Sequence, residues 1–313
     1  MSATAMAAGA RRPSADHADL ASERSRLWRL LLWPPFVIAL ALLVLPQAVF
    51  VWMSFHKSLG MGLVSDFLTI ENYRRVLTDP FYLHAMWMTF YLSLGATLIN
   101  LALALPTAYY LARLRSRWVS YFVVLLLVSL FVTVVIKVLA LYLVLGKEGM
   151  INHTLRALYL ISEPVQMLNS QLGVLIGLVQ YTLPLLVMLM IGVFQTIPSS
   201  LEDAAEVHGA TWFSSLSRVV LPLAWPGVIA GSLIVFNMNM GAFTSAVLLG
   251  GGRVLTFPVL IHRKVILDVD YAMGATLSTV LLVFVLLVNL ASVLLLRERR
   301  GSGSQRAATV HVS

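Results

Sequence analysis

The side chains that could take part in chemistry gather in one polar run, 198-PSSLEDAAEVHGATWFSSLSRVVLP-222, inside an otherwise apolar chain. Three carboxylates lie close together in it, on Glu202, Asp203 and Glu206. On a helix, Glu202 and Glu206 are four residues apart and repel each other unless a cationic partner lies opposite. A membrane-surface helix is the other interpretation, but an anionic inner leaflet repels an acidic helix. The chemistry that this run predicts is therefore the binding of a partner.

The same run carries the signals of a short helix over about 200–208. Ser200 stands three residues before Asp203, which is the spacing of a capping box. Ala204 and Ala205 have high helix propensity, and Gly209 suits a left-handed end of the helix. Thr211 can cap a second helix over 212–220, which Pro222 is expected to stop. Isolated helices of this length are marginal in water, so another protein surface should pack against the first.

Catalytic, metal and nucleotide motifs are missing from the sequence. It contains no G-x-x-x-x-G-K-[ST] phosphate loop, no H-E-x-x-H and no G-x-S-x-G, and it contains no cysteine. The histidines are scattered, and His208 is interpreted as a surface residue of the polar run. We therefore expect no catalytic residue, no metal site and no cofactor in this chain. An intramembrane enzyme is disfavoured, because no acidic residue falls within the apolar segments.

The elements that must position the polar run are membrane spans. Of the 313 residues, 59% are hydrophobic and 12% are charged, against about 25% charged in an ordinary soluble domain. About 20 apolar residues cross a bilayer. The sequence therefore predicts an all-α integral membrane protein with six transmembrane helices, near 31–54, 87–112, 120–145, 172–196, 225–249 and 272–296.

The arginines and lysines predict the orientation of these spans. With both termini in the cytoplasm, the inner segments carry 13 basic residues and the outer loops carry 8. The turn 113-RLRSRWV-119 holds three of the inner arginines. This bias matches the positive-inside rule, so the net charge of +8 indicates orientation and predicts no nucleic-acid partner. The polar run then faces the cytoplasm.

The remaining segments organise the chain as one membrane domain over 27–297 with polar tails, expected to be disordered, at 1–26 and 298–313. The first apolar segment is too long for a cleaved signal peptide and is expected to stay. Short outer helices are expected within 70–84 and 150–160. Small-residue pairs, Gly173 with Gly177 and Gly227 with Gly231, favour close helix packing.

Three polar residues within the spans are candidates for a solute path. Lys137 is the one charge inside a predicted span, about 12 Å from its outer end. It either faces a cavity or extends its stem to the outer headgroups. Asn237 and Asn239 are two residues apart, so they should lie on different faces of their helix, and we expect one of them to line the path.

The polar run resembles a motif of the permease subunits of ATP-binding-cassette importers. In that family Glu-Ala-Ala is followed at fixed offsets by Gly, Ile, Leu and Pro. Here Asp203-Ala204-Ala205, Gly209, Val219, Leu221 and Pro222 stand at those positions, with Asp for Glu and Val for Ile. The resemblance implies a type I importer permease fold in which the helix at 200–208 is a coupling helix that docks on a cytoplasmic ATPase.

The resemblance also implies partners. They are a second permease, similar or identical, two cytoplasmic ATPase subunits that bind ATP and Mg²⁺, an external solute-binding protein and the lipid of a bacterial inner membrane. Four stretches are similar to the spermidine/putrescine and opine branch of the family: 71-ENYRRVLTDPFY-82, 104-ALPTAYYLAR-113, 146-GKEGMINHTL-155 and 241-GAFTSAVLLGGGR-253.

The solute and one rival function stay open at this stage. A cationic Lys137 in the path would suit an anionic or zwitterionic solute better than a polyamine. A membrane scaffold or sensor that docks a cytoplasmic partner without transport is the alternative of another class. Prolines within the spans, at 34, 35, 46, 106, 184 and 226, favour a bundle that moves.

Overall fold

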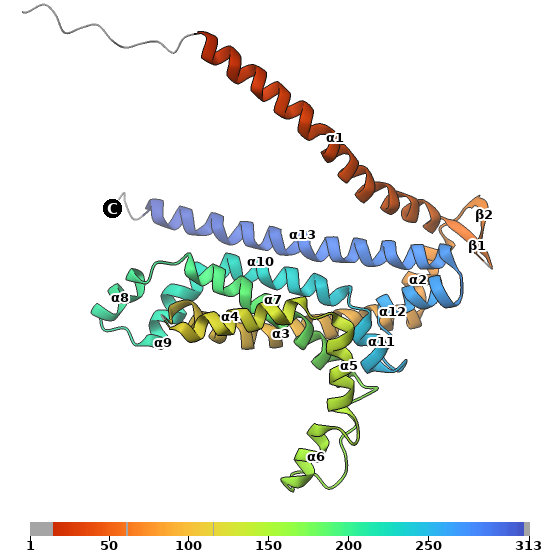
Figure 1. Cartoon of the computed structure of the whole chain (residues 1–313). Coiled ribbons are helices and arrows are strands. Elements are labelled where there is room, and N and C mark those ends of the chain that lie inside the picture. Colours follow the sequence, from red (N-terminus) through yellow and green to blue (C-terminus); the bar gives the residue numbers. More distant parts are fainter. Residues whose placement is uncertain (1–14, 61, 115, 310–313) are drawn as a thin grey trace, which may run out of the picture. The chain divides into compact units, whose positions relative to one another are not determined.

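The computed structural model describes the backbone of residues 15–60, 62–114 and 116–309 (Figure 1). The predicted tails fall partly on 1–14 and 310–313, which lie outside the described residues. The other residues of the two predicted tails are helical. Helix α1 begins at Ala15, and helix α13 ends at Thr309. The domain limits at 27 and 297 stay predictions.

The chain divides into two compact units, Met1–Trp52 and Met53–Ser313. The first unit holds most of helix α1 (Ala15–Ser54), which contains Pro34, Pro35 and Pro46. The apolar segment Trp33–Ser54 of α1 is long enough to span a membrane, and none of its most apolar 18-residue window is buried within the chain. An apolar surface this extensive is stable only in lipid or against another protein.

The second unit is built around four long helices, α3 (Pro80–Arg113), α7 (Gln171–Gln195), α10 (Leu221–Met240) and α13 (Tyr271–Thr309). Figure 1 shows them running side by side, and α3, α7 and α10 contact one another. The core shared by α3, α7 and α10 buries large side chains such as Phe194 and Leu186 completely.

The small-residue faces bring these helices close together, as the sequence predicts. A Cβ added at Gly227 on α10 would stand 2.6 Å from Val193 Cγ2 on α7, and one at Gly231 would stand 2.5 Å from Met190 Cε. Gly173 of α7 is also confined, but by the loop before its own helix, since an added Cβ would stand 2.4 Å from the Met167 carbonyl oxygen. Backbone approach therefore depends on glycine at these positions.

The expectation of one continuous third span over 120–145 is wrong. The segment forms two helices, α4 (Arg117–Phe131) and α5 (Val134–Leu145), and the chain bends by 100° between them. The break falls in the β-branched run Val132-Thr133-Val134-Val135, which has low helix propensity, and the Thr133 side chain caps α5 by accepting from the Ile136 amide. Among the described residues, five helices qualify as spans, or six if the bent pair is one span.

The fifth predicted span, 225–249, also ends early. Helix α10 stops at Met240, and a separate short helix, α11 (Thr244–Gly250), follows after a turn at Gly241. Gly251 then ends α11 in the left-handed region, with a φ of +52°. The glycines of 241-GAFTSAVLLGGGR-253 thus divide a run that apolar composition alone makes continuous.

The outer loops contain the expected short helices, α2 (Glu71–Thr78) and α6 (Met150–Ala157), together with elements that the sequence does not predict. The latter are an antiparallel hairpin of β1 (His56–Gly60) and β2 (Leu63–Leu68), and a pair of short helices, α12 (Phe257–His262) and the π-helix η2 (Arg263–Leu267). They lie at the end of the bundle opposite the polar run (Figure 1).

Candidate functional site

The first helix of the polar run, α8 (Ser200–Val207), lies between α7 and the start of α10. The expected capping box is wrong, because Ser200 is already helical and Ser199, with helical φ and ψ, makes no side-chain cap. The Glu202 amide bonds instead to the Ser199 carbonyl at 2.9 Å. The chain leaves α7 by a tight turn, so the backbone has helical dihedrals before a capping side chain could turn inward.

The other end of α8 agrees with the sequence. Gly209 has a φ of +82°, its amide bonds to the Glu206 carbonyl at 2.8 Å, and the Ala210 amide bonds to the Ala205 carbonyl. This is the left-handed termination expected of Gly209. Thr211 then caps the next helix, α9 (Trp212–Ser215), by accepting from the Ser214 amide.

Pro222 does not stop the second helix. Helix α9 passes through a π-helical turn, η1 (Leu216–Val220), directly into α10, so that Trp212–Met240 is one candidate span. In the π turn the Leu221 amide bonds five residues back, to Leu216. Pro222 falls in the first turn of α10, where a missing N–H is tolerated. Val219 and Leu221 are half-buried beside this turn, whereas Pro222 is exposed.

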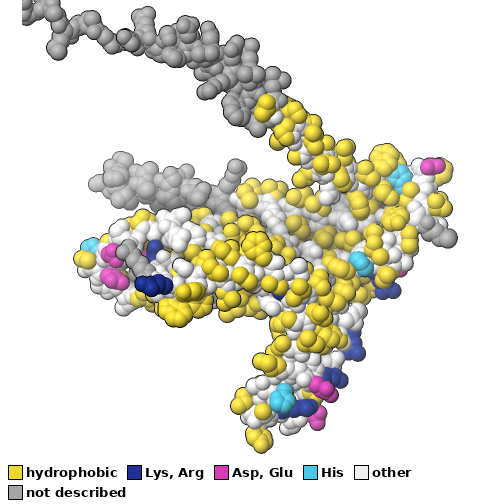
Figure 2. Space-filling view, in the orientation of Figure 1, with side chains coloured by type: hydrophobic (Ala, Val, Ile, Leu, Met, Phe, Trp, Pro, Cys, Tyr) yellow, Lys and Arg dark blue, Asp and Glu magenta, His cyan; other side chains and the backbone are white. Residues whose placement is uncertain are grey.

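One face of α8 is open to solvent and is both anionic and apolar. Asp203, Ala204, Glu206 and His208 are exposed, and Val207 is 86% exposed. Phe213 of α9 adds a second apolar side chain, 70% exposed. Figure 2 shows acidic side chains and a histidine together at this end of the molecule. Exposed apolar side chains beside carboxylates are suited to a protein partner rather than to water.

Glu202 does not belong to this open face. Its carboxylate lies 2.5 Å from Arg113 Nη2 at the end of α3, and it accepts a hydrogen bond from the Tyr109 hydroxyl. The sequence predicts Glu202 at the partner contact and does not predict its pairing with Tyr109 or Arg113. The available signal was the arginine that ends 104-ALPTAYYLAR-113, at the same membrane side as the polar run.

The two asparagines of α10 point to different helices, as their spacing predicts. Asn239 is buried, and its Oδ1 accepts from the Thr182 hydroxyl of α7 at 3.4 Å. The same hydroxyl accepts from Asn100 Nδ2 of α3 at 2.7 Å. Asn237 pairs with Asn289 of α13. Both amides therefore serve contacts between helices of this chain, and a role in a solute path stays a proposal.

Lys137 lies on α5, after the bend, with an exposed fraction of 9%. Because the chain bends before α5, the depth predicted for Lys137 from a straight span no longer applies. Within the described part of the chain, the three salt bridges do not include it. Its place in a solute path therefore also stays a proposal.

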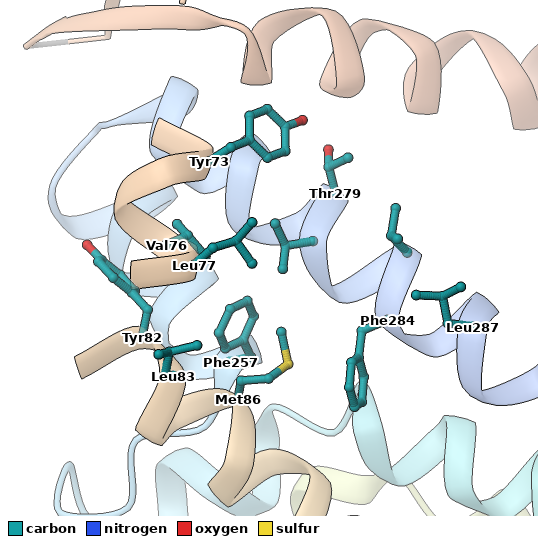
Figure 3. Close-up of a pocket in the computed structure, with 12 residues that line it drawn as sticks. Tyr73, Val76, Leu77, Tyr82, Leu83, Met86, Phe257, Thr279, Phe284 and Leu287 are labelled. Carbon is teal, nitrogen blue, oxygen red and sulfur yellow. The ribbon is translucent and has the colours of Figure 1, made fainter. Parts of the chain in front are cut away.

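An apolar groove of about 430 Å³ lies at the outer half of the bundle between α2, α3, α12 and α13. Figure 3 shows side chains such as Met86, Phe257 and Leu287 around it, with hydroxyls only on two tyrosines and Thr279. The residues that line the groove include no charged side chain. Among the described residues, no group of three or more His, Asp or Glu side chains could hold a metal ion.

Comparison with known proteins agrees with this arrangement. Residues 101–300 match the family described as binding-protein-dependent transport system inner membrane component. The spermidine/putrescine transport system permease protein PotB of Escherichia coli strain K12 is 31% identical over 237 residues, which cover 76% of this chain and 86% of that protein. PotB of Haemophilus influenzae is 29% identical over 245 residues, covering 78% and 85%.

A solved structure shows the same fold. The crystal structure of a bacterial ABC transporter involved in the import of the acidic polysaccharide alginate contains a chain that matches with a TM-score of 0.70, at 17% identity, over 88% of this chain and 98% of that one. The fold, the apolar helices and the family match agree. This chain therefore belongs to the family of inner membrane components of binding-protein-dependent transport systems, as a multi-pass permease of the bacterial inner membrane.

Proposed function

We propose that this permease imports a polyamine and that α8 is the coupling helix, docked on a separate cytoplasmic ATPase. The observation that carries the docking is the open face of α8, where Asp203 and Glu206 stand beside the exposed Val207. This face lies at the end of the bundle that carries the arginine-rich turn 113–119, since Arg113 contacts Glu202. The positive-inside rule assigns that end to the cytoplasm.

The motif residues have different roles in docking. Asp203, Glu206 and the flat surface of Ala204 and Ala205 form the contact, and Gly209 turns the chain away from it. Val219, Leu221 and Pro222 connect the docked segment to α10. ATP and Mg²⁺ bind to the ATPase, because this sequence has no phosphate loop.

The complete importer contains two permeases, two ATPase subunits and an external binding protein that delivers the solute. ATP binding draws the ATPase subunits together and shifts the permease pair from an inward-open to an outward-open state. A shift from 1:99 to 99:1 requires about 5.5 kcal/mol of differential ATP binding between the two states. The docked helix must therefore be held firmly both by the ATPase and by the rest of the permease.

The polyamine assignment rests on the PotB relatives, which are named as permeases of spermidine/putrescine transport systems. An anionic or zwitterionic solute is the second candidate, and the observation that favours it is the burial of Lys137 in α5. A buried ammonium beside the path would repel a polycation and attract a carboxylate or oxyanion.

Reconstitution tests both parts of the proposal. The permease pair and the ATPase are placed in lipid vesicles with ATP inside, and the uptake of labelled spermidine from its loaded binding protein is measured. We expect uptake that requires both ATP and the ATPase. A binding protein whose melting temperature rises with an anion but not with spermidine would contradict the polyamine assignment, and association without any solute flux would favour a scaffold or sensor.

A further inference from the structure

The covalent link that joins α8 to α10 is compliant. Gly209 follows α8 with a φ of +82°, and a Cβ built on it would meet no atom within 4 Å. Beyond it, the π turn η1 replaces regular helix hydrogen bonds, and Pro222 contributes no N–H. No residue of α8 itself is buried. Movement of α8 is therefore only weakly coupled to α10 through this link.

Glu202 supplies a stiffer connection from α8 to the inner end of α3. One carboxylate oxygen, Oε1, lies 2.5 Å from Arg113 Nη2 as an ion pair, and the other accepts from the Tyr109 hydroxyl. The side chains of Arg113 and Glu202 are only 22% and 13% exposed. Partial burial strengthens a charge pair relative to one in water, because the surrounding dielectric constant is lower.

Arg113 and Tyr109 each contact more than α8. Arg113 Nη1 donates to the Ile197 carbonyl, 2.9 Å away, in the turn between α7 and α8. The Tyr109 ring packs edge-on against Phe194 of α7, with 5.6 Å between ring centroids, and 5.8 Å from the ring of Trp212 of α9. The end of α3 therefore holds both sides of the α8 segment.

We propose that Tyr109, Arg113 and Glu202 form a clamp that makes α3 the helix through which movement of α8 enters the bundle. The clamp rests on the proposed docking of α8 on an ATPase and adds the route by which that movement travels. Helix α3 has 34 residues and is about 50 Å long. Near its other end, Thr89 accepts from the Phe257 amide of α12 at 2.8 Å. Helix α3 thus connects the inner clamp with the outer elements, and Pro106 lies within it three residues before Tyr109.

The charge of Glu202 is the part of the clamp that a single substitution removes most cleanly. Glu202→Gln keeps the length and one acceptor oxygen, but it leaves the half-buried Arg113 guanidinium without its anion. Arg113→Lys keeps a positive charge, but a lysine lacks the planar guanidinium that contacts both Glu202 and the Ile197 carbonyl. Exchanging the charges, with Arg113→Glu and Glu202→Arg together, restores an ion pair between the same helices.

The experiment compares these variants in the reconstituted importer, with labelled spermidine as the probe. Three quantities are measured for each: the yield of ATPase that co-purifies, the rate of ATP hydrolysis, and spermidine uptake per ATP hydrolysed. Arg117→Gln is the matched control, because Arg117 is an exposed arginine four residues after Arg113. We expect Glu202→Gln and Arg113→Glu to keep the ATPase and its hydrolysis but to lower uptake per ATP by roughly 5- to 150-fold.

The outcomes separate the clamp from the docking. Recovery of uptake per ATP in the charge-exchanged protein, with Arg117→Gln unchanged, supports the clamp, since a purely structural role would alter stability without this pattern. Wild-type uptake per ATP in Glu202→Gln overturns the clamp and leaves the docking intact. Loss of the ATPase from Glu202→Gln also overturns it, because Glu202 would then be part of the docking contact.

Discussion

Asn237 on α10 and Asn289 on α13 exchange two hydrogen bonds, each 3.0 Å long, between their side-chain amides. Asn289 Nδ2 also donates to the Val285 carbonyl of its own helix at 2.7 Å. Both residues lie within helices that are long and apolar enough to span a membrane. A polar pair of this kind between transmembrane helices stabilises their packing by roughly 0.6–2 kcal/mol, so it fixes where α13 lies along α10.

Breaking this pair from one side should cost more than removing both partners. Asn237→Leu leaves the Asn289 amide without its partner and should lower the free energy of unfolding by about 1–2 kcal/mol, whereas Asn237→Leu with Asn289→Leu should recover most of the loss. Denaturant titration of the permease in detergent measures both. Additive losses would show that the two amides act independently. Reduced solute uptake in the restabilised double variant would support a path role for Asn237.

Two glycines of α7 should respond in opposite ways to the same substitution. Gly173→Ala places a methyl group against the Met167 carbonyl oxygen and should destabilise the chain by about 1–3 kcal/mol. Gly192→Ala is the matched control, because that glycine is exposed and a Cβ there meets nothing within 4 Å. It should be neutral or stabilise the helix by up to about 1 kcal/mol. Equal melting temperatures for the two variants would contradict the close packing at Gly173.

Gly209→Val should separate solute uptake from ATP use while leaving membrane insertion intact. Valine is strained at a φ of +82°, by about 1–2 kcal/mol, so the end of α8 must change direction. Gly252→Val is the control, because Gly252 also has a positive φ, +74°, and open surroundings but lies in an outer turn. The ratio of uptake to ATP hydrolysis in vesicles is the measurement. A normal ratio in Gly209→Val would count heavily against the docking role.

Asp203→Lys should weaken co-purification of the ATPase by reversing a charge on the open face of α8. The remaining association should become less sensitive to salt, since an attractive ion contact has been lost. Glu163→Lys makes the same change at an exposed acidic residue of the outer loop and should leave the yield unchanged. If Asp203→Lys retains the full yield at every salt concentration, that carboxylate lies outside the contact.

The sequence by itself determined the membrane class, the approximate place of most of the spans and the left-handed end of the helix in the polar run. Each of these depends on residues that are near one another along the chain. An apolar run long enough to cross a bilayer, an arginine-rich turn or a left-handed Gly209 is specified by its own few residues.

Only the tertiary structure decided how the polar side chains are used. Glu202 turns inward because Tyr109, 93 residues earlier, meets its carboxylate, and Asn237 pairs with Asn289, 52 residues later. Composition alone likewise does not indicate the bend between α4 and α5, because the segments on both sides of the bend are apolar. Contacts between distant residues depend on how helices pack, and packing depends on the whole set of facing side chains rather than on any local pattern.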